Sequence, residues 1–497
     1  MSARDAVTAL RRFGLGPKPG ERARIAADPR GFLLQSLTDR AKAQIADTGL
    51  EPSHVVFAAA MAAQRRQRLA RANAAEPGTI MQDGAKEGMQ DTAKEGAAEA
   101  APAPEPRQAP QPAPGASAAI SAPPAEKLGQ IRREALLGEG AARFRHAAAT
   151  DNALVERLVM FWSNHFCVSA NKGPVRGMAG AYEREAIRPH VLGRFVDMLL
   201  AVERHPAMLV YLDNHVSVGP GSRAGTNRGL GLNENLAREI LELHTLGVGG
   251  GYTQVDVTSL ARILTGWTIA NLDNPRAEPG RFFFAPPRHE PGEWTVLGKR
   301  YPAGGVEMGE AVLRDLAAHR ATARHIASKL ARHFVAAEPP PSLIAKLERT
   351  FLATGGDLAA LARTLVEAPE AWAAPPVKVL PPYDFLVAVM RGFTLEPRPE
   401  LLMRLSAQLG QPLWRPPSPA GWPDADTTWA APSALRERLR IAEVAARQAD
   451  RSADPRRVAE DLFGAALGAP TAEAIARAEV REQGLELLIM SPEFQRR

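Results

Sequence analysis

The chain has almost no cysteine, because only Cys167 among its 497 residues carries a thiol. An intrachain disulfide is therefore impossible, and the stability of the fold does not require an oxidising compartment. A lone cysteine is more often a small buried apolar residue than a nucleophile, so we expect Cys167 to lie in the core. Aromatic residues are also scarce, at 6%, which favours helices over sheets in a chain dominated by alanine and leucine.

Long hydrophobic runs are missing as well, since no stretch of about 18 apolar residues occurs. The sequence therefore predicts no membrane span. Two adjacent arginines, Arg11 and Arg12, could begin an export signal, but Pro17, Lys18 and Pro19 follow where such a signal needs an apolar segment. We therefore expect a cytoplasmic protein.

The motifs of several common enzyme classes are absent too. The sequence has no Gly-x-Ser-x-Gly elbow, no P-loop, no glycine-rich dinucleotide fingerprint after a strand, no His-Glu-x-x-His and no Cys/His metal knuckle. The formal charge of +6 invites a nucleic-acid interpretation. However, 61 basic residues are interspersed with 55 acidic ones, so the charge pattern carries no strong signal for a nucleic-acid partner.

What the chain does contain is a helical, globular pattern, with 45% hydrophobic residues. It predicts an all-α fold with a large, bundle-like main domain at residues 127–497, on which the N-terminal helices of residues 1–73 pack. Between them, residues 74–126 are rich in Ala, Pro, Gly, Glu and Gln and carry an octapeptide repeat, which predicts a disordered insert. A small β-hairpin is expected near residues 282–298, where aromatic runs meet Pro-Gly turns.

The segment 231–268 holds the clearest local signals. Asn233 is a good N-cap for a first helix, and Gly247 supplies the left-handed residue that ends it. Thr253 with Asp256 then resembles a capping box at the start of a second helix. The pattern therefore predicts a helix, a glycine-rich turn and a second helix, with an apolar stripe of the first helix facing the core.

A second face of the first helix is charged. Glu234, Arg238 and Glu242 are four residues apart, with Glu239 beside them and His244 in the last turn. One interpretation is a network of ion pairs that fixes helix packing. The other is an active or metal site, because clusters of carboxylates and histidines in helical bundles hold metals. The spacing fits a di-metal site poorly, since that signature needs Glu-x-x-His and Glu242 lies two residues from His244.

Histidines elsewhere add further candidates. His165 closes an apolar helix among aromatic residues, where it is either a core histidine or a ligand. His289 and Glu290 follow the expected strand in a loop, where functional residues are common. Three more histidines at helical spacing in an arginine-rich helix are interpreted as surface or core residues: His319, His325 and His333.

These segments, in this order, resemble the bacterial family known as domain of unknown function 1800. The matching segments are 12–17, 161–166, 233–247, 252–257, 264–267, His289, 321–323, 329–330 and 409–423. They cover nearly the whole chain outside the insert. The chain differs from many members in having Glu290 in place of Asp, in having His244 in place of an aromatic residue and in lacking a twin-arginine export signal. The family is named for its unknown activity, so the resemblance implies none.

Two functional hypotheses follow. In the first, the protein is an enzyme that performs acid–base or metal-assisted chemistry, because burying charge on apolar, well-capped helices is costly without a use. Its pocket would gather His165, Glu234, Arg238, Glu239, Glu242 and His289. In the second, the protein is a non-catalytic scaffold or accessory protein, and the same residues form a closed salt-bridge network. The sequence identifies no cofactor, metal, partner or oligomeric state.

Overall fold

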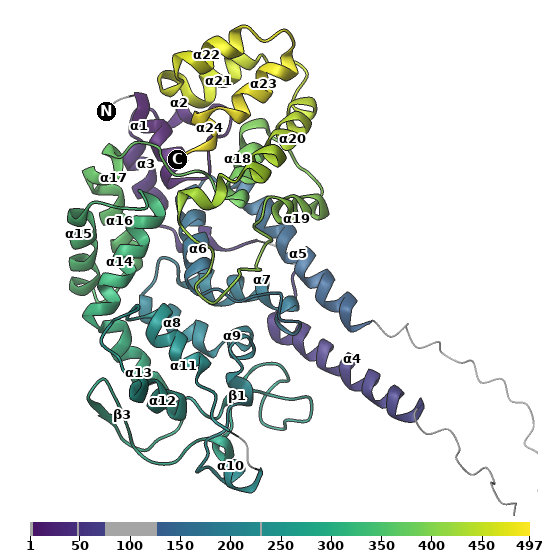
Figure 1. The fold of residues 1–497 in the computed structure, drawn as a ribbon, viewed down its shortest axis with the longest axis vertical. Coiled ribbons are helices and arrows are strands. Elements are labelled where there is room, and N and C mark those ends of the chain that lie inside the picture. Colours follow the sequence, from purple (N-terminus) through teal and green to yellow (C-terminus); the bar gives the residue numbers. More distant parts are fainter. Residues whose placement is uncertain (1–2, 47–48, 75–126, 229–230) are drawn as a thin grey trace, which may run out of the picture.

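The computed structural model describes residues 3–46, 49–74, 127–228 and 231–497. In this part of the chain helices dominate, and the strands form only two small two-stranded sheets (Figure 1). The predicted all-α fold class is therefore confirmed. The insert predicted over 74–126 lies, from residue 75 onward, outside the described residues. None of the described helices combines the length and the apolar character needed to cross a bilayer.

The first half of the fold consists of helices that are mostly short. They are α1 (Ala3–Thr8), η1 (Ala9–Phe13), α2 (Glu21–Ile25), α3 (Pro29–Ser36), η2 (Arg40–Ala43), α4 (Ser53–Ala74), α5 (Leu128–Ala149), α6 (Ala153–His165), η3 (Val175–Gly177), α7 (Ala179–Tyr182), η4 (Glu183–Ile187), η5 (Arg188–His190), α8 (Phe195–Arg204), α9 (Pro206–Tyr211), η6 (Asn214–Val216), α10 (Arg223–Arg228), α11 (Asn235–Glu239), η7 (Ile240–His244) and α12 (Gln254–Ile263). The longest, α4 and α5, lie side by side and flank the insert (Figure 1).

The second half contains the strands and a further series of helices. They are β1 (Trp267–Ile269), β2 (Phe282–Phe284), η8 (Pro286–Arg288), β3 (Trp294–Val296), β4 (Lys299–Tyr301), α13 (Val306–Ala318), α14 (Arg320–Phe334), α15 (Pro341–Ala353), α16 (Leu358–Glu367), α17 (Pro369–Ala373), α18 (Pro382–Phe393), α19 (Pro399–Gln408), η9 (Asp426–Trp429), α20 (Pro432–Gln448), α21 (Pro455–Phe463), η10 (Gly464–Ala466), α22 (Ala469–Ala476), α23 (Arg481–Met490) and α24 (Pro492–Gln495). Many of these helices begin with a proline, which has a fixed φ suited to the first turn.

Strands occur at both segments where the sequence indicates them, but each pairs with a neighbour outside the expected hairpin. β2 is antiparallel to β1, and β3 is antiparallel to β4. The β3–β4 turn consists of Leu297 and Gly298, which both have positive φ, the conformation of the tight turns that suit hairpins. Trp267 of β1 packs edge-on against Phe282 with ring centroids 5.5 Å apart, which explains why the aromatic run pairs with β1.

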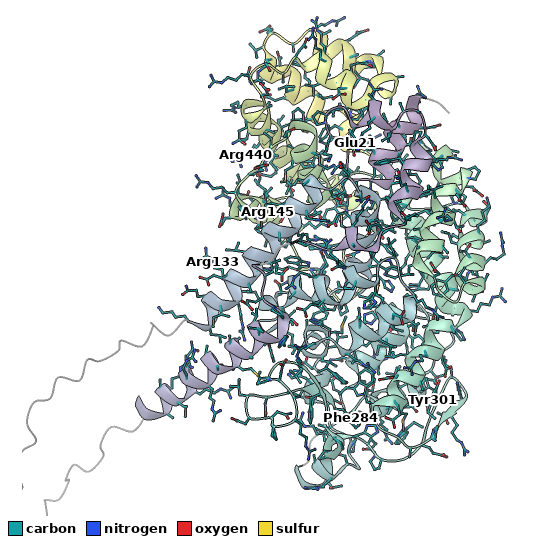
Figure 2. The ribbon with its side chains drawn as sticks, turned by 180° about the vertical axis from the view of Figure 1, so that it is seen from behind. Glu21, Arg133, Arg145, Phe284, Tyr301 and Arg440 are labelled. Atoms are coloured by element: carbon teal, nitrogen blue, oxygen red, sulfur yellow. The ribbon has the colours of Figure 1, made fainter. Side chains whose placement is uncertain are left out.

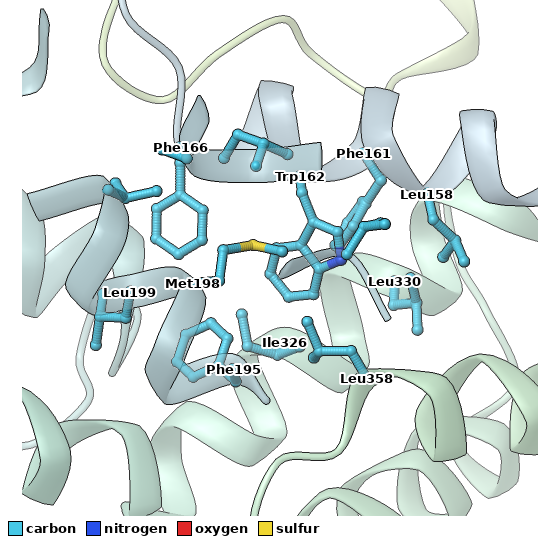
Figure 3. Packing of buried hydrophobic residues seen from close by; sticks show 14 of the residues in the cluster. Leu158, Phe161, Trp162, Phe166, Phe195, Met198, Leu199, Ile326, Leu330 and Leu358 are labelled. Carbon is cyan, nitrogen blue, oxygen red and sulfur yellow. The ribbon is translucent and has the colours of Figure 1, made fainter. Parts of the chain in front are cut away.

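The core is centred on the aromatic residues of α6. Phe161 and Trp162 pack against α8 and α14, where Phe195, Met198 and Leu330 cover them (Figure 3). The rings of Trp162 and Phe195 lie 5.8 Å apart. A second apolar cluster joins α18, α20, α21 and α23 at the C-terminal end. Residues of α1 enter both clusters, so the N-terminal helices are packed onto the main body.

A buried ionic network lies beside this core. Both nitrogen arms of Arg188 contact Glu156, at 2.7 Å, and one of them also contacts Glu183 at 2.9 Å. Arg143 reaches Glu183 as well, at 3.0 Å, and all four side chains are almost completely buried. Burial alone would lower the pKa of Arg188, but the two carboxylates outweigh it and raise the pKa. The network therefore holds its charges at neutral pH.

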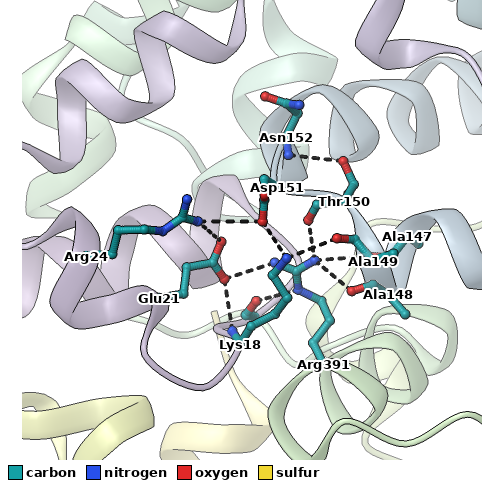
Figure 4. Close-up of polar contacts among 11 residues, drawn as sticks. Lys18, Glu21, Arg24, Ala147, Ala148, Ala149, Thr150, Asp151, Asn152 and Arg391 are labelled. Carbon is teal, nitrogen blue, oxygen red and sulfur yellow. Dashed lines mark hydrogen bonds and ion pairs between the residues drawn. The ribbon is translucent and has the colours of Figure 1, made fainter.

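A second polar network attaches the N-terminal segment to the C-terminal end of α5 (Figure 4). The guanidinium of buried Arg391 donates to the carbonyls of Ala147 and Ala148, both at 3.2 Å, and to that of Thr150 at 2.8 Å. It also pairs with Glu21 at 3.1 Å. Terminal carbonyls of a helix lack partners within the helix, so Arg391 supplies the donors that α5 needs.

The faces of α5 show how one helix separates buried from exposed charge. Arg133 and Arg145 are exposed and point outward (Figure 2), whereas Arg143 is buried in the ionic network. Arg440 on α20 also faces outward in this view. Some arginine side chains of this protein are thus exposed at the surface, whereas others are buried, several of them in ion pairs.

We predict that Arg188→Leu destabilises the protein by about 3–5 kcal/mol, because Glu156 and Glu183 would each lose a buried ionic partner. The matched control is Arg238→Leu, which removes only a half-exposed ion pair and should cost about 0.5 kcal/mol. Urea unfolding of both variants measures the difference. Equal losses in the two variants would contradict the importance of the buried network.

Candidate functional site

The structure places Glu234 and Arg238 in a surface network. Arg238 Nη2 lies 3.1 Å from Glu234 Oε2, and the two side chains are 40% and 31% exposed. Gln254 and Thr258 of α12 also donate to the Glu234 carboxylate, at 2.8 and 2.7 Å. The N-cap position of α11 is Glu234, one residue after the predicted Asn233, and the Asn233 side chain accepts from the amide of Asn235 at 2.9 Å. These contacts join α11 to α12 and satisfy the charges locally.

The other two acids of this segment lie deeper. Glu242 accepts a hydrogen bond from the Tyr252 hydroxyl at 3.0 Å. Glu239 is half-buried, and burial raises its pKa while nearby His244 lowers it in part. The predicted capping box of Thr253 with Asp256 is confirmed, and Gly247 has the predicted left-handed φ of +85°, but the helix already ends at His244. The helix itself widens to a π-helix from Ile240 to His244.

His165 and His289 lie in separate surroundings. His165 is 1% exposed, and its Nε2 donates to the His244 carbonyl at 3.1 Å. His289 Nδ1 donates to the Thr265 carbonyl at 2.9 Å, while the neighbouring Glu290 accepts from the Gly221 amide at 2.7 Å. Within the described ranges, the only direct polar contact among the six predicted residues is the Glu234–Arg238 pair. The six therefore do not form one hydrogen-bonded site.

A different polar group gathers on α14 and faces His165. His325, Lys329 and His333 are four residues apart and so share one face of the helix. The rings of His165 and His325 lie 6.0 Å apart. Burial lowers the pKa of Lys329, and burial together with the Lys329 charge lowers that of His165 well below its usual value. Neutral imidazoles therefore surround a lysine that makes no hydrogen bond or ion pair with the described residues.

The next turn of this face carries a carboxylate–histidine pair. His333 Nδ1 lies 3.2 Å from Asp424 Oδ1. Burial lowers the pKa of His333 to about 4, although Asp424 acts in the opposite direction. Burial would raise the pKa of Asp424, but His333, Lys378 and Arg497 outweigh it and lower the pKa to about 2. At neutral pH the pair is therefore a neutral imidazole beside a carboxylate, and His333 Nε2 is buried without a hydrogen-bond partner among the described residues.

His333 and Asp424 lie on the wall of a pocket between α6, α14, α18 and the segment 411–429. The cavity itself has a volume of about 90 Å³, inside a hollow of about 720 Å³ that includes the part open to solvent. Its aromatic walls are Tyr383, Trp414, Trp422 and Trp429, and its polar walls include Arg143, Ser163, Asn164 and Asp384. Small-molecule sites combine an apolar lining with a few polar groups in this way.

The pocket forms where two separated segments meet. Asn164 of α6 donates to the Trp422 carbonyl at 2.9 Å and accepts from the Trp422 amide at 2.7 Å. Gly421 lies against Asn164 with φ +85°, a conformation that favours glycine. Both segments carry residues that resemble the family motifs, at 161–166 and 409–423. The family-like residues thus converge on one side of the pocket.

Cys167 also lines this pocket and is 4% exposed, which confirms that it is buried. Its thiol lies 3.2 Å from the Pro419 carbonyl, to which it donates. Burial raises the pKa of the thiol to about 12. Because the thiolate is the nucleophilic form, Cys167 is a thiol at neutral pH and acts as part of the wall.

No group of three or more His, Cys, Asp or Glu side chains within the described ranges is arranged to hold a metal ion. The sequence analysis missed Lys329 and Asp424 and treated His333 as an ordinary helix residue. The available signals were the spacing of four residues on α14 and the position of Asp424 directly after the Gly-Trp-Pro motif at 421–423. The spacing marks a shared helix face, but only the tertiary structure shows that Asp424 meets that face.

The fold and the pocket define a helical protein that contains a pocket with both aromatic and polar walls. The chain belongs to the family described as protein of unknown function (DUF1800), whose family model matches residues 8–496. No curated protein and no solved structure matches the chain significantly.

We predict that Gly421→Ala destabilises the protein by about 3 kcal/mol or more, because the new Cβ would lie 2.5 Å from the Asn164 carbonyl oxygen at a positive φ. Gly410→Ala is the control, since Gly410 also has a positive φ, +92°, but open space around it. That variant should lose only about 1–2 kcal/mol. Chemical denaturation compares the two, and similar losses would show that the Asn164 contact is unimportant.

The buried histidines predict a pH dependence of stability. The pKa of His325 falls to about 4, chiefly through burial, so the folded state resists protonation. Because the folded pKa lies below the unfolded value, the stabilisation is present above pH 6.5 and is lost as the pH falls toward 4. Between pH 7 and pH 5, His325→Gln should therefore lose about 1–2 kcal/mol less stability than the wild type. Urea unfolding at the two pH values measures this, and parallel losses would contradict the assignment.

Proposed function

We propose that the protein is an enzyme that performs acid–base chemistry on a small molecule bound in the pocket between α6, α14 and residues 411–429. The observation that carries this proposal is the pairing of His333 Nδ1 with Asp424 at 3.2 Å, while Nε2 is buried and lacks a hydrogen-bond partner among the described residues. A carboxylate that accepts from Nδ1–H leaves the Nε2 lone pair available to take a proton, and it stabilises the imidazolium that then forms.

The walls of the pocket suggest the kind of substrate. Four aromatic side chains favour a ligand with a flat or apolar body. Arg143, Ser163 and Asn164 make this part of the wall polar, although the hydroxyl of Ser163 donates to Glu183 and the amide of Asn164 is bound to Trp422. The pKa of His333, about 4, keeps the imidazole neutral at pH 7, and a ligand that offsets the burial would have to raise this pKa for efficient proton transfer.

Two residues of the original candidate group, His165 and Glu239, remain part of this proposal. His165 faces the same side of α14, and its Nδ1 is buried without a hydrogen-bond partner among the described residues. Glu239 has a raised pKa and affects the thiol of Cys167 on the pocket wall. We assign His165 to the polar surroundings of Lys329, whose charge helps to lower the His165 pKa, and Glu239 to the surroundings of the Cys167 thiol. Glu234, Arg238, Glu242 and His289 are proposed to be structural.

The alternative is a non-catalytic scaffold or accessory protein. The observation in its favour is the Glu234–Arg238 network, in which both charges are satisfied by each other and by α12. Under this alternative, His333 and Asp424 would likewise serve only to join α14 to the segment 411–429. Their replacement would then change stability and leave no chemical consequence.

The tautomer of His333 tests the proposal without a known substrate. We expect ¹⁵N NMR at pH 7 to show a protonated Nδ1 and an unprotonated Nε2, and Asp424→Asn to disturb this preference. His319, an exposed histidine that caps the same helix, provides the control His319→Asn, which should leave the His333 signals unchanged. A wild-type His333 protonated on Nε2 at pH 7 would contradict its assignment as the base.

A reaction found by screening small esters, hydroxy acids and carbonyl compounds would provide the second measurement. We expect His333→Gln to lower kcat/KM by about 10²–10⁴-fold, the usual contribution of a positioned acid or base. The His319→Asn variant should keep full activity. Retained activity in a folded His333→Gln variant would rule out the proposed role of this side chain.

A further inference from the structure

A second pocket lies where α1, η1, the segment 374–376, α21 and the C-terminal residues meet. In Figure 1 the two labelled ends of the chain lie near each other in this region. The charged residues of its wall are Arg4, Arg11, Arg12, Arg496, Arg497 and Glu493. Five positive charges therefore face one negative charge. The cavity itself has a volume of about 230 Å³, which is below the roughly 300–1,000 Å³ of sites for drug-sized ligands and suits a small ligand.

Three of these arginines are buried: Arg11, Arg12 and Arg497 are 5%, 2% and 2% exposed. Arg12 donates to the carbonyls of Ala371 and Ala374, each at 2.7 Å. Arg11 donates to the carbonyls of residues 494 and 496 through Nε and Nη2. The twin arginines thus hold the C-terminal segment and the segment 371–375 against η1.

Several donors of the same guanidinium groups remain unused. Arg11 Nη1, Arg12 Nε and both Nε and Nη1 of Arg497 are buried and have no hydrogen-bond partner among the described residues. Buried polar groups in folded proteins are nearly always hydrogen-bonded, because an unpaired buried donor costs free energy. A cluster of unused arginine donors beside a pocket therefore indicates an acceptor that binds from outside the chain.

The single acid of the wall does not balance the charge. Glu493 accepts from the Gly468 amide and from the Thr471 hydroxyl, both at 2.9 Å, so its oxygens are directed to α22. The buried carboxylate of Asp384 lies 2.8 Å from Arg157 and 3.9 Å from Arg497 and is shared between them. Burial is the main cause that lowers the pKa of both Arg11 and Arg497 to about 9, and the charge of Arg157 adds to it.

We propose that this arginine pocket binds a divalent oxyanion, either inorganic phosphate or the phosphoryl group of a small organic phosphate. The planar fork of arginine matches phosphate oxygens through paired N–H donors, and a doubly charged ligand would offset the surplus of positive charge. The exposed side chains of Arg4 and Arg496 lie at the rim and would contact the ligand as it enters. The pocket is lined by none of the residues that form the His333–Asp424 pocket, so the two inferences stand independently.

The test measures phosphate binding to the full chain by calorimetry and by the shift of Tm, with chloride at matched ionic strength as the reference. We expect saturable binding of inorganic phosphate and a higher Tm in its presence. Phenyl phosphate distinguishes the source of the ligand: tighter binding than inorganic phosphate indicates an organic phosphate, and weaker binding indicates the free ion. Absence of saturable binding for both would overturn the proposal.

Two sets of variants make the test specific to this pocket. Arg4→Gln with Arg496→Gln should weaken phosphate binding at least threefold, whereas Arg300→Gln on β4, also an exposed arginine, should not change it. Thr8 lines the pocket between the arginines, so Thr8→Glu places a carboxylate where the ligand would bind. Thr8→Glu should have a higher Tm than Thr8→Gln without phosphate and should no longer bind it. A Thr8→Glu variant that binds phosphate like the wild type would overturn the proposal.

Discussion

Helix α6 is enclosed by the rest of the protein, and its charged side chains must therefore find their partners inside. Glu156 meets Arg188, Arg157 meets Asp384 and the Gly14 carbonyl, and His165 donates to the His244 carbonyl. A buried charge without a partner costs several kcal/mol, so each of these contacts fixes the position of another element. Together they tie the N-terminal segment, η5, η7 and α18 to one central helix, with the apolar face of α6 packed against α8 and α14.

The same requirement explains where the pocket forms. At the C-terminal end of α6, Asn164 and the following Cys167 contact the segment 411–429. The backbone of that segment forms hydrogen bonds with both side chains. This docking brings Asp424 to His333 on α14, two residues separated by 91 positions in the chain. The proposed chemistry thus depends on a loop whose position is set by backbone hydrogen bonds. The atom on which the proposed role depends is His333 Nε2, which has no hydrogen-bond partner within residues 3–46, 49–74, 127–228 and 231–497.

Local patterns in the sequence predict local structure well. The capping box at Thr253 and the left-handed conformation of Gly247 depend on residues within a few positions of one another, and both occur in the structure. The predicted helix ends are close but displaced, since the N-cap is Glu234 and the last helical residue is His244. The strand at Phe282 was also predicted from the sequence, but its partner strand at Trp267 was not, because strand pairing depends on residues distant in sequence. The candidate site was harder for the same reason. The spacing of the charged residues after Asn233 predicted a functional site. In the structure, however, α12 lies close enough to form hydrogen bonds with Glu234 and Arg238 at the surface. Asp424 has no helical neighbour that could mark it, so its pairing with His333 required the tertiary fold.

The two pockets are separate in their walls but are linked through Arg497. Its charge lowers the pKa of Asp424 in one pocket and that of Arg11 in the other, and it stands 3.9 Å from Asp384 between them. An oxyanion beside Arg11 and Arg497 would offset part of this positive charge. The pKa of Asp424 and the pKa of His333 would then both rise, because the positive charge of Arg497 lowers both of them. Because electrostatic interactions between buried groups are weakly screened, the occupation of the arginine pocket would change the proton affinity of the His333–Asp424 pair without any movement of the backbone.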